Sequence, residues 1–141
     1  MLTEFLQTGN GTVIVNGLQP QPISGIKNVL LAAQTSLMQL ILPRDANGQI
    51  LPGAYCGEYM IQAFDVLTGD VFNRLVRVAI TRFAGSTVIA VPQVIGTTAI
   101  GALAGMIESP VVLPSGDVDF TVTTGVAASV NVSGLGVFLT V

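Results

Sequence analysis

The chain has 141 residues, of which 50% are hydrophobic and 9% are charged, and 5 Lys and Arg against 8 Asp and Glu give a formal net charge of -3. A soluble domain usually carries about 25% charged residues, so much of this surface is expected to contact other protein rather than water. The length suits one domain, the hydrophobic content excludes a disordered chain, and the acidic, charge-poor balance argues against nucleic-acid binding.

Several residue types on which enzymes and metal sites depend are missing. There is no His and no Trp, and Cys56 is the only Cys. This excludes Ser-His-Asp and Cys-His nucleophiles, His-based metal sites, Cys clusters and an intramolecular disulfide. Cys56 is expected to be a small buried residue, with a reactive thiol as the alternative. The N-terminus has no basic segment leading into an apolar run, so no signal peptide is predicted.

Turn signals and β-branched runs predict strands along most of the chain. Asn10-Gly11 and Asn47-Gly48 are typical of type I′ turns, and further turn clusters lie at 68–70 and 114–117. Strands are predicted at 12–16, 60–67, 71–83, 86–91, 118–123, 129–133 and 136–141. The Gln-Pro-Gln-Pro segment at 19–22 is predicted to be a polyproline-like link, and residues 1–22 are a candidate extended N-terminal arm.

The segment from Val29 to Leu42 is compatible with two structures. It contains neither Pro nor Gly, and six of its apolar residues lie on an approximate helical face. A strand over 36–42 is favoured, because Ser36, Gln39 and the neighbouring turns suit a β-sheet.

No charged residue lies between Arg82 and Glu108, a stretch long enough to cross a bilayer. Pro92 and several Gly and Thr residues interrupt the stretch, so a transmembrane helix is not predicted even though Gly101 and Gly105 form a GxxxG. The glycines between 96 and 105 match neither a dinucleotide fingerprint nor a P-loop. They are assigned to tight turns and close strand packing.

The last three predicted strands alternate most clearly. In the first, Val118, Phe120 and Val122 are expected to face the core, opposite a solvated face that carries Asp117, Asp119, Thr121 and Thr123. In the second, Val130 and Val132 repeat the pattern. After a turn at 134–136, the final strand is predicted to place one apolar set on the core face, namely Leu135, Val137, Leu139 and Val141. The chain is therefore expected to end in a paired core strand.

Asp117 and Asp119 are close enough on one strand face to share a cation such as Ca²⁺. Two carboxylates are too few for a hard cation, and nothing apolar is predicted around them to raise one pKa for catalysis. They are interpreted as a solvated strand face.

Arg74, Arg77 and Arg82 supply three of the five basic residues. Strand parity places Arg74 and Arg82 on one face and Arg77 on the other, so they do not form a phosphate-binding stripe. Cross-strand ion pairs with Asp65 and Asp70 are expected, with subunit contacts as the alternative.

These patterns predict a single all-β domain over residues 1–141, an antiparallel β-sandwich or barrel of jelly-roll-like form. No catalytic, cofactor-binding or metal-binding residue is predicted, and no cofactor is expected.

From Val71 to Val141, about half of the chain, the sequence resembles the small β-sandwich modules of tailed-bacteriophage virion proteins, capsid decoration proteins and fibre-associated domains among them. The similar parts are the arginine-bearing strand RLVRVAITRFAGSTVIA and the closing series DVDFTVTTGVAASVNVSGLGVFLTV. The last strand of such modules often carries a Trp, where this chain has Phe138. The resemblance implies a non-enzymatic virion component, made in the host cytoplasm, that acts through assembly.

The leading hypothesis is a capsid cement or decoration protein that binds and stabilises the assembled shell. Its partners would be itself and the major capsid protein or another virion protein, with no nucleic acid and no membrane. A homo-trimer is preferred, because decoration in the resembled family often sits at local threefold positions. The alternatives are a tail or fibre module that binds a receptor or carbohydrate, and a head-tail adaptor. A hydrolase that uses carboxylates is the least favoured hypothesis.

Overall fold

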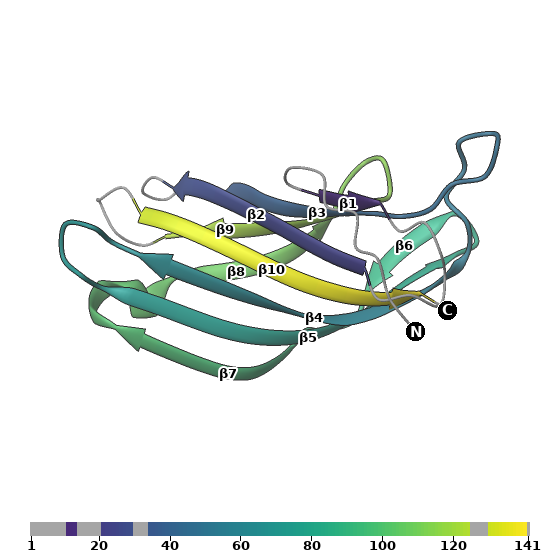
Figure 1. Ribbon diagram of the computed structural model, residues 1–141. Helices are drawn as coiled ribbons and strands as arrows, with labels where there is room; N and C mark the ends of the chain where they lie inside the picture. Colours follow the sequence, from purple (N-terminus) through teal and green to yellow (C-terminus); the bar gives the residue numbers. More distant parts are fainter. Residues whose placement is uncertain (1–10, 14–20, 30–33, 125–129, 141) are drawn as a thin grey trace, which may run out of the picture.

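The computed structural model describes residues 11–13, 21–29, 34–124 and 130–140. These residues form two β-sheets that pack face to face (Figure 1). The predicted all-β, antiparallel sandwich class is confirmed. In the described part of the chain, helical structure is limited to one 3₁₀ segment, η1 (Gly101–Gly105).

The two sheets use strands that are far apart in sequence. The smaller sheet has the order β1-β3-β9-β8 and the larger has the order β2-β10-β4-β5-β6, with β7 pairing the other end of β5. All pairings are antiparallel except β1 with β3. The strands are β1 (Gly11–Val13), β2 (Gln21–Val29), β3 (Thr35–Ile41), β4 (Gly53–Phe64), β5 (Val71–Phe83), β6 (Ser86–Ile89), β7 (Gln93–Ile100), β8 (Ile107–Val112), β9 (Val118–Thr123) and β10 (Val130–Thr140).

An aromatic cluster joins the two sheets at the centre of the core. The Tyr59 and Phe120 ring centroids are 4.7 Å apart, and those of Phe120 and Phe138 are 5.6 Å apart. All three side chains are fully buried. Since Phe120 comes from β9 and the other two from β4 and β10, these contacts hold the sheets together.

The predicted core face of β9 is confirmed, because Val118, Phe120 and Val122 are buried. The opposite face was predicted to be solvated, and that prediction is wrong. Asp117 and Asp119 are only 6% and 7% exposed, because β9 lies inside its sheet between β3 and β8 and both carboxylates are bonded to neighbouring side chains.

The favoured strand between 36 and 42 is confirmed, since β3 runs along the inside of the smaller sheet and buries Leu37, Met38 and Leu40. Residues 30–33 of the helical alternative lie outside the described residues. The turns at 47–48, 68–70 and 114–117 are confirmed by the positive φ of Gly48, Gly69 and Gly116.

The final strand is paired as predicted, but its face was predicted wrongly. β10 is one continuous strand with no turn at 134–136, and it pairs β2 on one side and β4 on the other. The alternation that turns Val130 and Val132 toward the core therefore continues unbroken along the strand. As a result, Phe138 points into the core, whereas Leu135, Val137 and Leu139 point outward. Val141 lies outside the described residues.

Glycine makes this orientation of β10 sterically possible. A Cβ at Gly134 would lie 2.7 Å from Leu37 Cδ2, and a Cβ at Gly136 would lie 3.0 Å from Ile23 Cγ1. Both positions face a core that is already full. Residues without a side chain therefore occupy these inward positions, and large apolar side chains occupy the outward ones between them.

Three strands were not predicted: β2, β7 and β8. Pro22 and Pro110 obscured two of them, and the many glycines after Pro92 obscured the third. Of the candidate arm over 1–22, most lies outside the described residues; within it, β1 pairs with β3 and Gln21 begins β2. In the described ranges, no helix is long and apolar enough to span a membrane.

Candidate functional site

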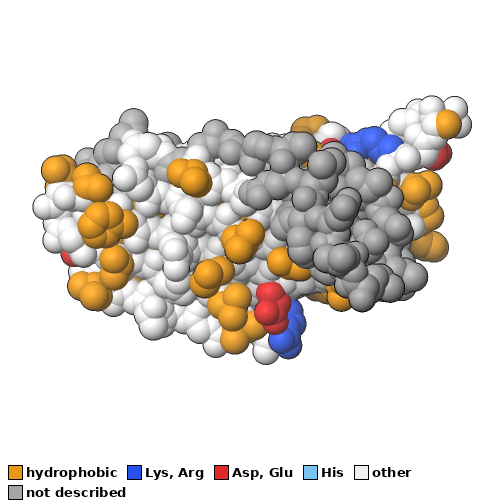
Figure 2. Space-filling view, in the orientation of Figure 1, with side chains coloured by type: hydrophobic (Ala, Val, Ile, Leu, Met, Phe, Trp, Pro, Cys, Tyr) orange, Lys and Arg blue, Asp and Glu red, His pale blue; other side chains and the backbone are white. Residues whose placement is uncertain are grey.

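The most distinctive surface is the outer face of the larger sheet, which we define as the side chains of β10, β4, β5 and β7 that point away from the core. Three large apolar side chains follow one another along β10 on this face, with Leu135 51%, Val137 41% and Leu139 50% exposed. On the face shown in Figure 2, hydrophobic side chains form scattered patches, and an acidic and a basic group adjoin one another at the lower edge. Such exposure in the middle of a sheet is typical of an interaction surface.

Strand register arranges the outer face into rows that cross the strands. An apolar row consists of Leu135, Met60 and Leu75. Beside it, four uncharged polar side chains on β10, β4, β5 and β7 form what we call the amide row: Ser133, Gln62, Asn73 and Thr98. The next row, at the end of the sheet, places Asn131 beside Phe64, Val71 and Ile100.

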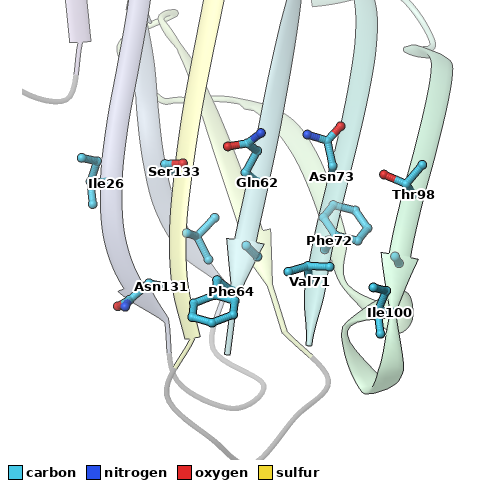
Figure 3. Close-up of a pocket in the computed structure, with 13 residues that line it drawn as sticks. Ile26, Gln62, Phe64, Val71, Phe72, Asn73, Thr98, Ile100, Asn131 and Ser133 are labelled. Atoms are coloured by element: carbon cyan, nitrogen blue, oxygen red, sulfur yellow. The ribbon is translucent and has the colours of Figure 1, made fainter. Parts of the chain in front are cut away.

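A groove of about 580 Å³ lies over the amide row and the row at the end of the sheet. Figure 3 shows the amide row side by side on four neighbouring strands, with Phe64, Val71 and Ile100 next to it. Ile26 of β2 adds a further apolar side chain to the lining. Asp, Glu, Lys and Arg are all absent from the described residues that line the groove.

One ion pair lies on the outer face. Arg77 Nη2 is 2.7 Å from Glu58 Oε1, and the Arg77 Nε also donates to that oxygen at 3.1 Å. Both side chains are exposed, so the pair stabilises the free fold by about 1 kcal/mol or less. Its opposite charges cancel locally, which keeps the face close to neutral.

The other two arginines of β5 lie on the opposite face, as strand parity predicted. Arg74 Nη1 is 3.6 Å from Glu108 Oε1, and Arg82 donates to Thr87 Oγ1 at 3.0 Å. The predicted ion pairs of these arginines with Asp65 and Asp70 are not formed. The Asp65 carboxylate accepts a hydrogen bond from a backbone amide of the 65–70 turn, and the Asp70 carboxylate accepts one from a backbone amide at the start of η1.

Glu108 is a buried carboxylate between the two sheets. Its Oε2 accepts a 2.5 Å hydrogen bond from the Tyr59 hydroxyl, and Arg74 approaches its other oxygen. Burial raises the pKa of Glu108, although the bonds from Tyr59 and Arg74 oppose this shift. The pKa of Tyr59 is also raised, by burial first and then by Glu108. These groups tie β4 and β5 to β8.

Asp117 and Asp119 have separate partners, so the structure does not bring them together as a cation site. Both Asp117 oxygens accept from Arg44, at 3.0 and 2.8 Å, and Asp119 Oδ1 accepts from Ser36 Oγ at 2.6 Å. Burial pushes the pKa of Asp117 up, but the hydrogen bonds from Arg44, the Leu42 amide and Ser115 outweigh it and hold the pKa below its ordinary value. No group of three or more metal-ligating side chains occurs among the residues that the structure describes.

Cys56 was expected to be buried, and this is wrong, because it is exposed on the outer face. It lies between Leu139 of β10 and Ala79 of β5. Sequence reasoning also missed the amide row. Gln62 and Asn73 carry no motif, and only the β4–β5 pairing places them side by side.

The chain matches no protein-family model, and no curated protein is significantly similar to it. Among solved structures, it is similar to the crystal structure of the Acinetobacter phage vB_ApiP_P1 tailspike protein, with a TM-score of 0.49 and 13% sequence identity. The match covers 85% of this chain and 22% of the tailspike chain. A similarity this low does not bear on function.

Proposed function

We propose that this chain is a structural protein of a bacteriophage particle, of the cement or decoration kind, that binds the assembled shell through the outer face of its larger sheet. The observation that carries the proposal is the orientation of β10, which presents Leu135, Val137 and Leu139 to the outside while Gly134, Gly136 and Phe138 face the core. The phage particle as the setting is supported by the resemblance of residues 71–141 to virion β-sandwich modules.

The outer face has the composition of a surface that becomes covered. Leu135, Val137 and Leu139 are each about half exposed, so covering each contributes roughly 1 kcal/mol. Met60 and Leu75 lie beside Leu135 and extend the apolar area. A standard-size interface that includes these side chains would add free energy to a shell without any chemistry.

The Glu58–Arg77 pair is compatible with such burial. A charge that enters an interface without a partner is costly, whereas a pair that is already formed and bonded costs less. Since Glu58 and Arg77 are bonded to each other in the free chain, the face can be covered without leaving a lone charge.

A non-enzymatic role is supported by the hydrogen bonds that the buried carboxylates make to neighbouring side chains. Asp117 and Asp119 are bonded to Arg44 and Ser36, and Glu108 is bonded to Tyr59. These are structural contacts within and between the sheets. The partners that we propose are the chain itself, preferably as a trimer, and the major capsid protein, without nucleic acid, membrane or cofactor.

The test is rebinding to phage shells that have been stripped of this protein. The unchanged chain should bind at a fixed stoichiometry and raise the resistance of the shells to heat. A Leu135→Ser, Leu139→Ser double variant should keep its fold and lose most of this binding. The matched control is Leu67→Ser, because Leu67 is strongly exposed and lies in the 65–70 turn, outside the four strands whose side chains form the outer face.

Two results would contradict the proposal. One is binding of the unchanged chain to purified tails but not to stripped shells, which would favour a tail or adaptor role. The other is equal shell binding by the double variant and the control, which would show that the outer face is not the contact.

A further inference from the structure

We propose that the groove over the amide row binds a short, neutral oligosaccharide. The groove differs in chemistry and in position from the part of the outer face that carries Val137 and Leu139, because it lies at the end of the sheet where Phe64, Val71 and Ile100 are found. The inference does not depend on the shell-binding role.

The amide row has hydrogen-bonding capacity that the described part of the chain does not use. None of Ser133, Gln62, Asn73 and Thr98 makes a side-chain hydrogen bond to another described residue. Each of these groups can both donate and accept. Sugar hydroxyls do the same, so a row of amides and hydroxyls matches a ligand that carries many hydroxyls.

The spacing of the row suits an extended ligand. Neighbouring strands lie about 4.8 Å apart, so four strands place the polar groups along roughly 14 Å. The row crosses β10, β4, β5 and β7 in register. A ligand that lies along it would meet one polar side chain per strand.

Apolar side chains line the groove beside the amide row. Phe64, Val71 and Ile100 form the neighbouring row at the end of the sheet, and Ile26 of β2 adds to the lining. The C–H faces of sugar rings can pack on such side chains while the hydroxyls bond to the row. The groove therefore offers both kinds of contact that a sugar needs.

The lack of charged side chains among the described lining residues indicates which class of sugar the groove would bind. The described lining residues include no Lys or Arg to attract sialic acid, sulfate or phosphate, and no Asp or Glu to attract a cation. Arg77, on the same face, is already bonded to Glu58. The expected ligand is thus built from neutral hexose or N-acetylhexosamine units.

A peptide is the less suitable occupant. Extended peptides gain much of their affinity from backbone bonds to a free strand edge. Here β10, β4 and β5 are each paired on both sides, so these strands have only side chains to offer to a ligand in the groove. The hydroxyls of a sugar use such side chains better than a peptide backbone does.

The test begins with an array of immobilised neutral hexose and N-acetylhexosamine oligosaccharides, with sialylated and sulfated glycans on the same array. The strongest neutral glycan is then titrated calorimetrically against the full chain. Gln62→Ala and Asn73→Ala should each weaken binding about tenfold with an unchanged melting temperature. The matched control is Gln93→Ala, because Gln93 is an exposed glutamine in β7 outside the groove lining, and it should leave the affinity unchanged.

Three results would overturn the inference: no neutral glycan bound on the array, a preference for acidic glycans, or equal affinities for the groove variants and the control. Loss of shell binding by Gln62→Ala and Asn73→Ala, with a silent array, would identify the groove as a protein contact instead. Shell binding is tested separately with the Leu135 and Leu139 variant, so the two proposals can fail independently.

Discussion

Separate alanine substitutions at two adjacent residues of β10 test the orientation of this strand directly. Phe138 is fully buried, with its ring 5.6 Å from that of Phe120, whereas Leu139 is 50% exposed on the outer face. Phe138→Ala would remove a large side chain from the contact between the sheets and should cost about 3–5 kcal/mol of unfolding free energy. Leu139→Ala would remove a side chain that water already reaches and should cost about 1 kcal/mol or less.

The assay is equilibrium unfolding in urea, followed by circular dichroism. Phe138→Ala should lower the transition midpoint strongly and Leu139→Ala only slightly, with similar slopes for both. The measurement is repeated at several protein concentrations, because a contribution from self-association would make the midpoint depend on concentration. A larger loss for Leu139→Ala than for Phe138→Ala would refute the orientation described above.

Three further predictions concern packing and pH. A Cβ at Gly25 would overlap the Leu37 carbonyl oxygen, so Gly25→Ala should cost at least about 3 kcal/mol, which urea unfolding would detect. Since the folded-state pKa of Glu108 is raised, this group contributes to folding stability in acid, and the contribution is lost as pH rises through that pKa. The melting temperature of the Glu108→Gln variant, measured relative to that of the unchanged chain, should therefore rise from acid to neutral pH. The folded-state pKa of Asp117 is lowered beside Arg44, so Asp117→Asn should destabilise the chain at neutral pH, and melting curves should show this loss shrinking as pH falls below about 4.

Local sequence patterns were sufficient for several strands. The predicted ranges 71–83 and 118–123 coincide with β5 and β9. Both follow turn clusters and contain several β-branched residues, so the local signal and the fold agree. Strand parity also separated Arg77 from Arg74 correctly, because alternation along a strand is a local property.

The outer face required the tertiary structure. Alternation says which residues share a face, but it does not say which face is buried when both carry apolar or small residues. A turn assumed at 134–136 shifted the parity of the last strand by one residue and reversed its predicted orientation. The crowding of Gly134 and Gly136 by Leu37 and Ile23 decides that orientation, and these contacts come from other strands.

The sequence by itself determined the all-β class, the turns at 47–48, 68–70 and 114–117 and the ranges of β5 and β9, because these depend on propensities and periods within a few residues. Only the tertiary structure decided which surfaces are exposed and which polar groups meet. Asp117 is buried because β9 lies inside its sheet and Arg44 bonds to the carboxylate. Gln62 and Asn73 form a row because β4 and β5 pair in one register, and the register depends on contacts between residues that are distant in sequence.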